Sequence, residues 1–322
     1  MCGFLVVGSS ELELQVFNDA LNQAAYRGPD HQHVSINNGI TWGFNRLSIM
    51  DLSSKGNQPF VYKDCVLVCN GEVYNYHSLK AMLETDYTFK SGSDCEVLIP
   101  LYHKYGIEIL CKFLDAEFAM VIYDAKKDKI LAARDPMGIR PMFYGYHKED
   151  GKICFASEAK GLFPLCQEIM PFPPGHYYED GKFICYNDLS NPKTINNDDL
   201  ETIATNLRLK LEKAVEKRLQ SDAPIGYLLS GGLDSSLVCA IAARLNDQPI
   251  KTFAIGMDTD PIDLKYAKQV ADYLGTDHTE VIMTKEDLLE NLRDVIFHLE
   301  TYDITTIRAS MAMYLLCKYI HE

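Results

Sequence analysis

The stretch Met1-Cys2-Gly3-Phe4-Leu5-Val6-Val7-Gly8 opens the chain with an apolar run that a glycine ends. No basic segment precedes this run, and the acidic residues Glu11 and Glu13 follow it closely, a pattern that is not typical of a secretory signal peptide. The run therefore predicts a buried strand at the start of the chain, with a cysteine directly before it.

Similar short apolar runs continue through the first half and predict further strands, at 40–44, 65–68, 119–123, 130–133 and 153–156. Two helices are expected among them. One carries Leu14, Phe17, Leu21 and Ala25 at helical spacing, and the other lies near 94–104. Many strands with few helices indicate packed, mostly antiparallel sheets, so the predicted class is α+β for a first domain at 2–186.

The second half has a different texture. A polar stretch at 187–198, with Pro192 and four asparagines, predicts a linker to a second domain at 199–322. Asp198-x-x-Glu201 resembles a helix-starting box, and an apolar stripe follows it, formed by Leu200, Ile203, Leu207, Leu211, Val215 and Leu219.

Strands and helices then alternate, with strands expected at 225–229, 251–256 and 278–283 and helices at 236–245, 264–274 and 307–322. This order predicts an α/β domain with a parallel sheet that binds ligands at the carboxyl ends of its strands. Three strands leave apolar edges and faces uncovered, so we expect this domain to be incomplete and prone to self-association.

Composition limits the class of protein. The 322 residues, at roughly 150 per domain, predict about two domains. Lys and Arg number 31 against 45 Asp and Glu, a formal charge of −14, which disfavours binding to nucleic acid or to anionic membranes. Ten irregularly spaced cysteines do not form a disulfide framework, and no apolar run reaches the roughly 18 residues of a membrane helix. We expect a cytosolic protein.

Cys2 is a candidate nucleophile. A small second residue generally permits removal of Met1, which would leave Cys2 with a free α-amine next to its thiol. A thiol with a pKa of roughly 8.5 and an α-amine with a pKa of roughly 7.7–8.0 form a nucleophile and base within one residue. On position alone, Cys2 could equally be a small residue that opens a buried strand.

Four later segments place charged or amide groups at turns, namely 27–30 (Arg-Gly-Pro-Asp), 46–51 (Arg-Leu-Ser-Ile-Met-Asp), 70–75 (Asn-Gly-Glu-Val-Tyr-Asn) and 91–94 (Ser-Gly-Ser-Asp). Arg46 suits the carboxylate of a glutamine substrate and Asp94 suits its ammonium group. Asn70 and the Gly71 amide could form an oxyanion hole. Each group taken singly is also an ordinary turn residue or a surface ion pair, and Asn-Gly is a common hairpin turn.

Taken in order, these segments resemble the class II glutamine amidotransferases, and the resemblance continues through 134–141 (Arg-Asp-Pro-Met-Gly-Ile-Arg-Pro) and 157–160 (Ser-Glu-Ala-Lys). It implies an N-terminal-nucleophile αββα sandwich in which the cysteine attacks the glutamine amide and releases ammonia. Cys2, Asn70 and Gly71 are then the catalytic residues. The implied glutamine-binding residues are Arg46, Leu47, Ser48, Ile49, Met50, Asn70, Gly71, Glu72 and Asp94.

Residues 228–236 (Leu-Leu-Ser-Gly-Gly-Leu-Asp-Ser-Ser) lie where a strand is expected to end and a helix to begin. Glycines let backbone amides approach an anion, the helix N-terminus adds partial positive charge, and Asp234 could hold Mg²⁺. A Walker-type Gly-x-x-x-x-Gly-Lys element is absent from the sequence. As a bare Gly-Gly turn, the loop is also consistent with a tight strand–helix connection.

The loop resembles the pyrophosphate loop of ATP pyrophosphatases, and with the glutaminase half it resembles the family of glutamine-dependent asparagine synthetases. The resemblance implies ATP and Mg²⁺ as cofactors, with glutamine, aspartate and ATP as small-molecule partners, and a possible homodimer. Implied ATP-binding residues are Leu228, Ser230, Gly231, Gly232, Asp234, Ser235, Ile255 and Gly256. The implied aspartate or phosphate residues are Glu300, Thr305, Thr306 and Arg308, for which helix capping or salt bridges are equally good readings.

The sequence departs from that family because a second phosphate loop and a basic segment that completes the ATP site are missing from the 322 residues. The predicted function is ATP-dependent asparagine synthesis through a β-aspartyl adenylate, with ammonia supplied at Cys2. Two alternatives stay open. One is a truncated form that only hydrolyses glutamine, and the other is a truncated paralogue without catalysis that binds partners.

Overall fold

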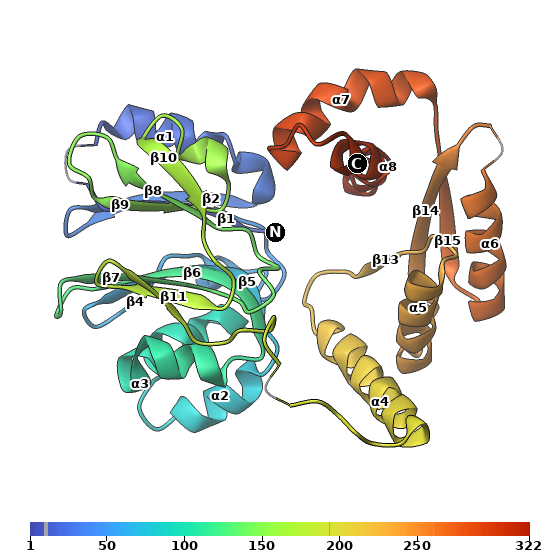
Figure 1. The fold of residues 1–322 in the computed structure, drawn as a ribbon, viewed down its shortest axis with the longest axis horizontal. Coiled ribbons are helices and arrows are strands. Elements are labelled where there is room, and N and C mark those ends of the chain that lie inside the picture. The colour runs from blue at the N-terminus through green and yellow to red at the C-terminus, as the bar shows by residue number, and fades with distance from the viewer. Residues whose placement is uncertain (10–11, 193, 260) are drawn as a thin grey trace. The chain divides into compact units, whose positions relative to one another are not determined.

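The computed structural model describes residues 1–9, 12–192, 194–259 and 261–322. The chain divides into two compact units, Met1–Asn196 and Asn197–Glu322 (Figure 1). Residue 193 of the predicted linker lies outside the described residues. Among the helices described, none combines the length and the apolar character needed to span a membrane.

The first unit contains two six-stranded sheets whose neighbouring strands pair antiparallel. In spatial order, one sheet has β10 (Cys166–Pro171), β8 (Phe143–His147), β9 (Ile153–Ala156), β1 (Gly3–Val7), β3 (Ile40–Arg46) and β2 (His31–Asn37). The other has β12 (Lys182–Cys185), β11 (His176–Glu179), β7 (Lys129–Arg134), β6 (Ala116–Asp124), β5 (Cys65–Val73) and β4 (Phe60–Tyr62).

The two sheets lie face to face and helices cover their outer faces, as Figure 1 shows. Helix α1 (Leu14–Asn22) covers the first sheet, and α2 (Tyr76–Leu83) and α3 (Leu98–Phe113) cover the second. Short 3₁₀ turns stand at η1 (Ala25–Arg27), η2 (Ser54–Gly56), η3 (Asp94–Val97) and η4 (Ala159–Gly161). The predicted αββα sandwich is confirmed.

Strand periodicity explains these layers, because alternate residues of a strand face opposite sides of its sheet. Val66 and Val68 of β5 pack with Trp42 of β3 between the two sheets. Leu67 and Cys69 of β5 point the other way, into the core beneath α2 and α3. The period-2 pattern of β5 therefore specifies both the interface between the sheets and the core beneath α2 and α3.

The expectation of only two helices in this unit was wrong. Helix α2 has eight residues, and it buries Tyr76, Leu79 and Leu83 at helical spacing. The helix expected near 94–104 begins with the turn η3, continues to Phe113, and is interrupted at Gly106, where φ is +80°. A short helix leaves too few apolar repeats for a periodicity argument to detect it.

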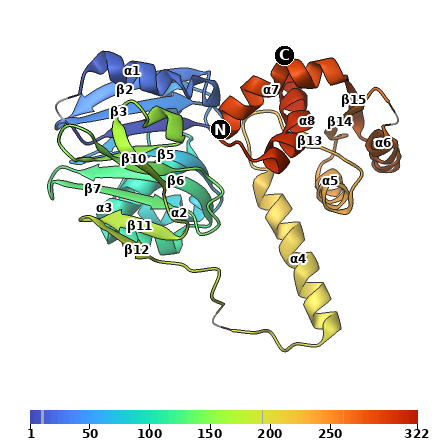
Figure 2. The same cartoon turned by 45° about the horizontal axis from the view of Figure 1, so that its top comes forward.

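The second unit confirms the predicted parallel sheet, with strand order β13 (Gly226–Leu228), β14 (Lys251–Met257), β15 (Asp277–Met283). Its helices are α4 (Leu200–Arg218), α5 (Leu233–Leu245), α6 (Ile262–Leu274), α7 (Lys285–Leu299) and α8 (Ile304–His321). Helices α6 and α8 both contact β14 and β15, and they lie on opposite faces of the sheet (Figures 1 and 2).

Two expectations for α4 need correction. The helix is capped by Asp199 instead of Asp198, because the Asp199 side chain accepts the Thr202 amide at 2.9 Å. The apolar stripe is only partly used, since Val215 is buried while Leu200 and Leu207 are 82% and 63% exposed. Only the C-terminal part of α4 therefore packs on the described core of this unit.

Candidate active site

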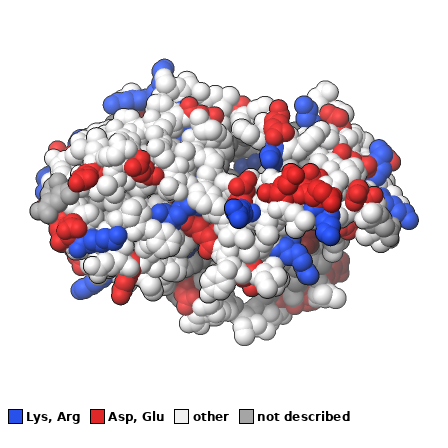
Figure 3. Space-filling model, turned by 90° about the horizontal axis from the view of Figure 1, so that it is seen from above, with Lys and Arg blue, Asp and Glu red and all other residues white. Residues whose placement is uncertain are grey.

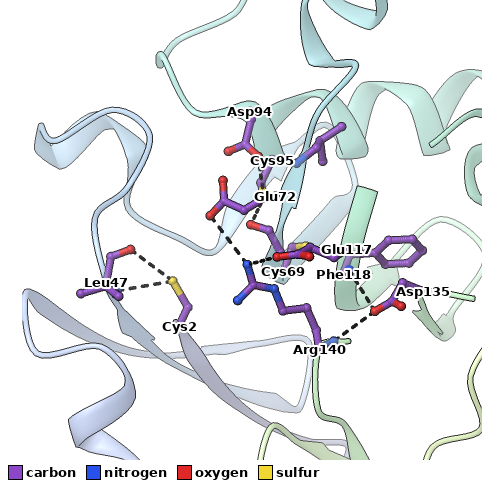
Figure 4. A network of polar contacts seen from close by, with 12 residues as sticks. Cys2, Leu47, Cys69, Glu72, Asp94, Cys95, Glu117, Phe118, Asp135 and Arg140 are labelled. Atoms are coloured by element: carbon purple, nitrogen blue, oxygen red, sulfur yellow. Dashed lines mark hydrogen bonds and ion pairs between the residues drawn. The ribbon is translucent and has the colours of Figure 1, made fainter. Parts of the chain in front are cut away.

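Cys2 stands directly before β1, a central strand paired with β3 on one side and β9 on the other. Its side chain packs against the apolar cluster between the two sheets. The thiol donates to the Leu47 carbonyl at 3.5 Å and accepts the Leu47 amide at 3.4 Å (Figure 4). These sulfur contacts are weak, so the thiol is placed mainly by the backbone that carries it.

The Cys2 backbone is held from η1. Arg27 Nε donates to the Cys2 carbonyl at 2.9 Å, and the Arg27 side chain lies across Gly3. A Cβ on Gly3 would come within 3.2 Å of Arg27 Cδ. The glycine after Cys2 therefore makes room for the arginine that binds the cysteine carbonyl.

The loop after β3 forms one wall beside the thiol, and Arg46 organises it. Arg46 Nη1 donates to the Ser53 carbonyl at 2.7 Å and to Asn57 Oδ1 at 2.6 Å. Arg46 Nη2 donates to the carbonyls of Met50 and Asp51. The terminal nitrogens of this predicted carboxylate-binding residue are thus bonded to the loop itself.

The same loop is tied to the Arg-Gly-Pro-Asp segment. The Ser48 amide donates to Asp30 Oδ2 at 2.6 Å, and the Asp30 amide donates to the Arg46 carbonyl at 3.0 Å. Gly28 sits so close to β3 that a Cβ there would lie 2.2 Å from the Asn45 carbonyl oxygen. This close approach explains the glycine, and the aspartate fixes the loop that touches the Cys2 thiol.

Asn70 and Gly71 lie in β5, whose register places Asn70 opposite Ala119 and Gly71 opposite Phe118. Asn70 is fully buried, and its Nδ2 has no hydrogen-bond partner among the described residues. Asn70 and Glu72 share the strand face of Val66 and Val68, which meets the sheet that carries Cys2. A buried amide without a protein acceptor is expected to bind a ligand oxygen.

Acidic groups gather beside this end of β5 (Figure 4). Asp94 is buried and accepts the Val73 amide at 2.6 Å. Burial raises the pKa of Asp94, and it raises the pKa of Glu72 from 4.5 to about 8, with further contributions from Asp94 and Glu117. Arg140 lies 2.8 Å from Glu117 and 4.0 Å from Glu72, so it offsets part of this negative charge.

Burial also shifts the pKa values of the Met1 α-amine and the Cys2 thiol at the N-terminus. Burial lowers the pKa of the Met1 α-amine from 8.0 to about 6, and the Arg27 and Arg140 charges lower it further while the Cys2 charge opposes them. Burial raises the pKa of the Cys2 thiol. At neutral pH this arrangement favours an uncharged amine next to a protonated thiol.

In the second unit, the segment 228–236 forms the turn between β13 and α5. The Ser230 and Ser235 hydroxyls lie 2.9 Å apart, and Ser235 and Ser236 donate to the Gly232 carbonyl at 3.2 and 2.6 Å. Gly231 has φ of +75°, and a Cβ there would lie 2.5 Å from the Ala267 amide nitrogen of α6. The loop therefore needs glycine for its conformation and for its contact with α6.

The other predicted nucleotide residues lie at the same edge of the sheet. Leu228 ends β13, Ile255 and Gly256 are near the end of β14, and Asp234 is in the first turn of α5. Over the described part of the chain, no group of three or more His, Cys, Asp or Glu residues could hold a metal ion. A divalent ion here would have Asp234 as its carboxylate ligand and would depend on phosphate oxygens for most of the others.

The predicted aspartate residues lie where α7 ends and α8 begins. Glu300 closes α7 in the left-handed conformation, with φ of +54°. Asp303 caps α8 by accepting the Thr306 amide at 2.7 Å, and Thr305 and Arg308 follow in the first turns of that helix. Thr306 thus takes part in helix capping, one of the readings left open above.

Sequence reasoning missed Arg27, Asp30, Glu117 and Arg140 as individual contributors to the site. Each lies inside a segment that the sequence had singled out or beside one, but its role depends on a partner far along the chain.

On the face that Figure 3 shows, basic side chains are scattered among acidic and uncharged ones and form no continuous patch. That face gives no support to a nucleic-acid interface.

Comparisons with known proteins match both units. A family model described as a glutamine amidotransferase domain matches residues 1–175, and one described as asparagine synthase matches residues 206–322. The chain is 42% identical to the probable asparagine synthetase [glutamine-hydrolyzing] of Schizosaccharomyces pombe, over 99% of this chain and 62% of that protein. It is also 42% identical to asparagine synthetase B [glutamine-hydrolyzing] of Escherichia coli, over 92% of this chain and 56% of that protein.

The chain thus spans between about half and two thirds of the length of these curated relatives. Among solved structures, the allosteric regulatory enzyme of purine biosynthesis matches with a TM-score of 0.50 at 15% identity, covering 88% of this chain and 80% of that one. This likeness concerns the fold alone.

Proposed function

Because the chain belongs to the glutamine amidotransferase family, we propose that its first unit hydrolyses glutamine to glutamate and ammonia at Cys2. The observation that carries this proposal is the position of the Cys2 thiol. It lies beside the Leu47 loop and near Glu72, at the interface between the two sheets, and the face of β5 that carries Asn70 meets the same interface. The thiol sulfur attacks the amide carbon and ammonia leaves. Water then breaks the thioester and restores the thiol.

The base in this scheme is the α-amine that Cys2 gains when Met1 is removed. In the described chain the terminal amine has a pKa of about 6 because it is buried. That value belongs to the Met1 amine. The Cys2 amine formed when Met1 is removed, with an ordinary pKa of roughly 7.7–8.0, can lose its proton near neutral pH, accept the thiol proton and then deliver it to the departing nitrogen. No other side chain is needed as the base.

The proposed oxyanion hole consists of Asn70 Nδ2 and the Gly71 amide. The tetrahedral intermediate carries its negative charge on the former amide oxygen, and donors already in place stabilise that charge without reorganisation. Asn70 Nδ2 is buried and has no acceptor among the residues that the structure describes, so this donor is available for a substrate oxygen. Residues 70–71 thus act on charge that develops only during the reaction.

Recognition of glutamine is assigned to the two ends of its backbone. Glu72 and Asp94 offer negative charge to the ammonium group. Leu47, Ser48, Ile49 and Met50 surround the carboxylate end, and Arg46 supplies positive charge while its terminal nitrogens hold this loop in shape. Binding the ammonium group lets the acids ionise, since a neighbouring cation lowers a carboxyl pKa.

Ammonia release from glutamine by the full chain tests this assignment. Cys2→Ala is expected to abolish release, whereas Cys185→Ala, at an exposed cysteine elsewhere in the unit, leaves it unchanged. Mass spectrometry of the intact protein establishes whether Met1 has been removed. Ammonia release that persists in Cys2→Ala would contradict the proposal, and so would a wild-type chain, processed to Cys2, that releases none.

For the second unit, we infer ATP binding at the 228–236 turn and activation of aspartate as a β-aspartyl adenylate, which ammonia converts to asparagine. The glycine turn before α5 and the asparagine synthase match at 206–322 support this inference. Leu228, Ile255 and Gly256 would contact the base, and Glu300, Thr305, Thr306 and Arg308 would lie near aspartate or phosphate. Asp234 would bind Mg²⁺ together with the phosphates.

Aspartate-dependent AMP formation from ATP, Mg²⁺ and ammonium, without glutamine, tests the second reaction. Wild type is expected to form AMP and Asp234→Asn to lose it, while Asp222→Asn, before β13, serves as the control. A chain that releases ammonia and forms no AMP would favour the second candidate, glutaminase activity alone.

The remaining assignments follow from the same family. We propose a glutaminase domain at 2–186, a linker at 187–198 and an ATP-binding domain at 199–322. A cytosolic location accords with ten free cysteines, and a homodimer is the proposed assembly. A paralogue that only binds partners would be indicated if neither ammonia nor AMP were formed.

A further inference from the structure

We propose that Glu158, two residues after β9, is a positioning residue for Cys2 that acts by holding the Arg27 guanidinium. This inference rests on the assignment of Cys2 as the nucleophile. It concerns a carboxylate that takes no part in the proposed reaction steps and that touches neither the thiol nor the glutamine-binding groups.

Glu158 is buried, and three side chains donate to its carboxylate. Arg27 Nη1 lies 2.9 Å from Oε1, and Lys160 Nζ lies 2.9 Å from Oε2. The Tyr26 hydroxyl lies 2.7 and 2.6 Å from the two oxygens. A buried carboxylate with two cationic partners and a hydroxyl is strongly fixed, because moving it would leave buried charges unpaired.

Arg27 transmits this fixation to the cysteine. Its Nη1 binds Glu158 and its Nε binds the Cys2 carbonyl at 2.9 Å, while Nη2 is buried without a hydrogen-bond partner among the described residues. Two hydrogen bonds therefore set the orientation of the guanidinium. If Glu158 is lost, only the bond to Cys2 remains, and the group that holds the cysteine backbone becomes free to rotate.

The residue before Glu158 is hydrogen-bonded to β1, the strand that follows Cys2. The Phe4 amide donates to the Ser157 hydroxyl at 3.0 Å, and the Ser157 amide donates to the Phe4 carbonyl at 3.0 Å. Ser157, the residue before Glu158, thus bonds to Phe4 of β1, and Arg27, which Glu158 binds, bonds to Cys2 at the start of the same strand. Since the thiol has only weak sulfur contacts of its own, a backbone shift at Cys2 displaces it directly.

A similar cluster elsewhere in the unit supplies a matched control. Asp124 is buried, accepts the Tyr102 hydroxyl at 2.8 Å, and pairs with Lys127 at 3.0 Å. In the β5–β6 register it lies five residues from Ala119, the partner of Asn70, which corresponds to about 17 Å along the strand. Losing this carboxylate removes a buried acceptor that has a hydroxyl donor and one cationic partner, without touching Cys2.

The test measures kcat and KM for glutamine hydrolysis and the rate at which iodoacetamide alkylates Cys2, read by mass spectrometry of the Cys2 peptide in the full chain. Glu158→Gln is expected to lower kcat about tenfold or more and to change the alkylation rate several-fold, with KM for glutamine within about twofold, since small misplacements of a nucleophile are costly. Asp124→Asn is expected to leave all three quantities unchanged.

Tyr26→Phe tests the same contact more mildly, because Tyr26 is 41% exposed and loses a single hydroxyl. A kcat about threefold lower than wild type is expected, with Tyr102→Phe as its control. Unchanged kcat and alkylation in both Glu158→Gln and Tyr26→Phe would overturn the inference, and so would equal losses in the Asp124 and Tyr102 controls. If wild type releases no ammonia, the proposed function fails, and the alkylation rates alone decide this inference.

Discussion

Replacing Glu72 by glutamine is expected to stabilise the first unit at alkaline pH and to bring no such gain at acidic pH. The pKa of this carboxyl is raised from 4.5 to about 8 because burial and the nearby Asp94 and Glu117 disfavour its charge, and Arg140 offsets only part of that effect. Glutamine keeps the shape and the hydrogen-bonding capacity of the side chain but cannot ionise. The variant therefore removes the titration and little else.

The sign and size of the effect follow from proton linkage. Below about pH 4.5 the carboxyl is protonated in both the folded and the unfolded chain, so the raised pKa costs nothing. Between about 4.5 and 8 the unfolded chain loses the proton while the folded chain keeps it, and the free energy of unfolding falls by about 1.4 kcal/mol per pH unit. Above about pH 8 the accumulated loss is roughly 5 kcal/mol, an upper value because Glu72 and Asp94 titrate together.

Urea unfolding between pH 5 and pH 9, followed by tryptophan fluorescence, measures this difference. The chain has a single tryptophan, Trp42, fully buried between the two sheets, so the signal reports on the first unit alone. The stability gained in Glu72→Gln should grow from pH 5 to about pH 8 and level off above it. Glu108→Gln, at an exposed glutamate paired with Lys112, should show a small difference that does not grow. A gain in Glu72→Gln that is constant across pH would refute the reasoning.

Three further predictions concern single contacts. Asn70→Ala should lower kcat for ammonia release about 10²- to 10³-fold by removing an oxyanion donor, and an unchanged kcat would exclude that role. Gly231→Ala should lower the unfolding temperature of the second unit alone, since its Cβ would lie 2.5 Å from the Ala267 amide, and calorimetry would resolve the two transitions. Gly43→Ala should cost about 1–3 kcal/mol in urea unfolding, because its Cβ would lie 2.7 Å from Leu21 Cδ2 beneath α1, and full stability would contradict that packing.

Much of the fold could be predicted because each strand carries its own local signal. The apolar run before Gly8 and the runs beginning at Ile40 and Cys65 form strands at those places. Gly275 ends α6 with φ of +68°, the conformation that its glycine indicates. The helix α2 was missed because eight residues contain too few apolar repeats to establish a period.

In the candidate site, too, some residues could be predicted from local sequence and others could not. Cys2 could be singled out by its position at the start of the chain, and Asp94 by the turn-forming residues before it. Asn70 was singled out in an Asn-Gly pair expected at a turn, but that expectation was wrong, because residues 70–73 continue strand β5. Arg46 donates hydrogen bonds to backbone carbonyls of its own loop and to the side-chain oxygen of Asn57. These bonds could not be predicted, because a loop without periodicity gives no indication of where its carbonyls point. Glu158 was still harder to assign, because its role depends on a residue 131 positions earlier in the chain.

The burial that raises the pKa of Glu72 also shapes what the site can bind. The Glu72 and Glu117 carboxyl groups lie near one guanidinium, that of Arg140, and the nearby Asp94 raises the pKa of Glu72 further, so the acidic groups outnumber the arginine that offsets them. Protonation of the acids relieves this imbalance, and a ligand ammonium group would relieve it better, because it supplies a full positive charge and hydrogen-bond donors. In the proposed reaction, the free-energy cost of burying these acids thus becomes selectivity for a substrate with a free α-ammonium group, because an amide that lacks this group would not offset that cost.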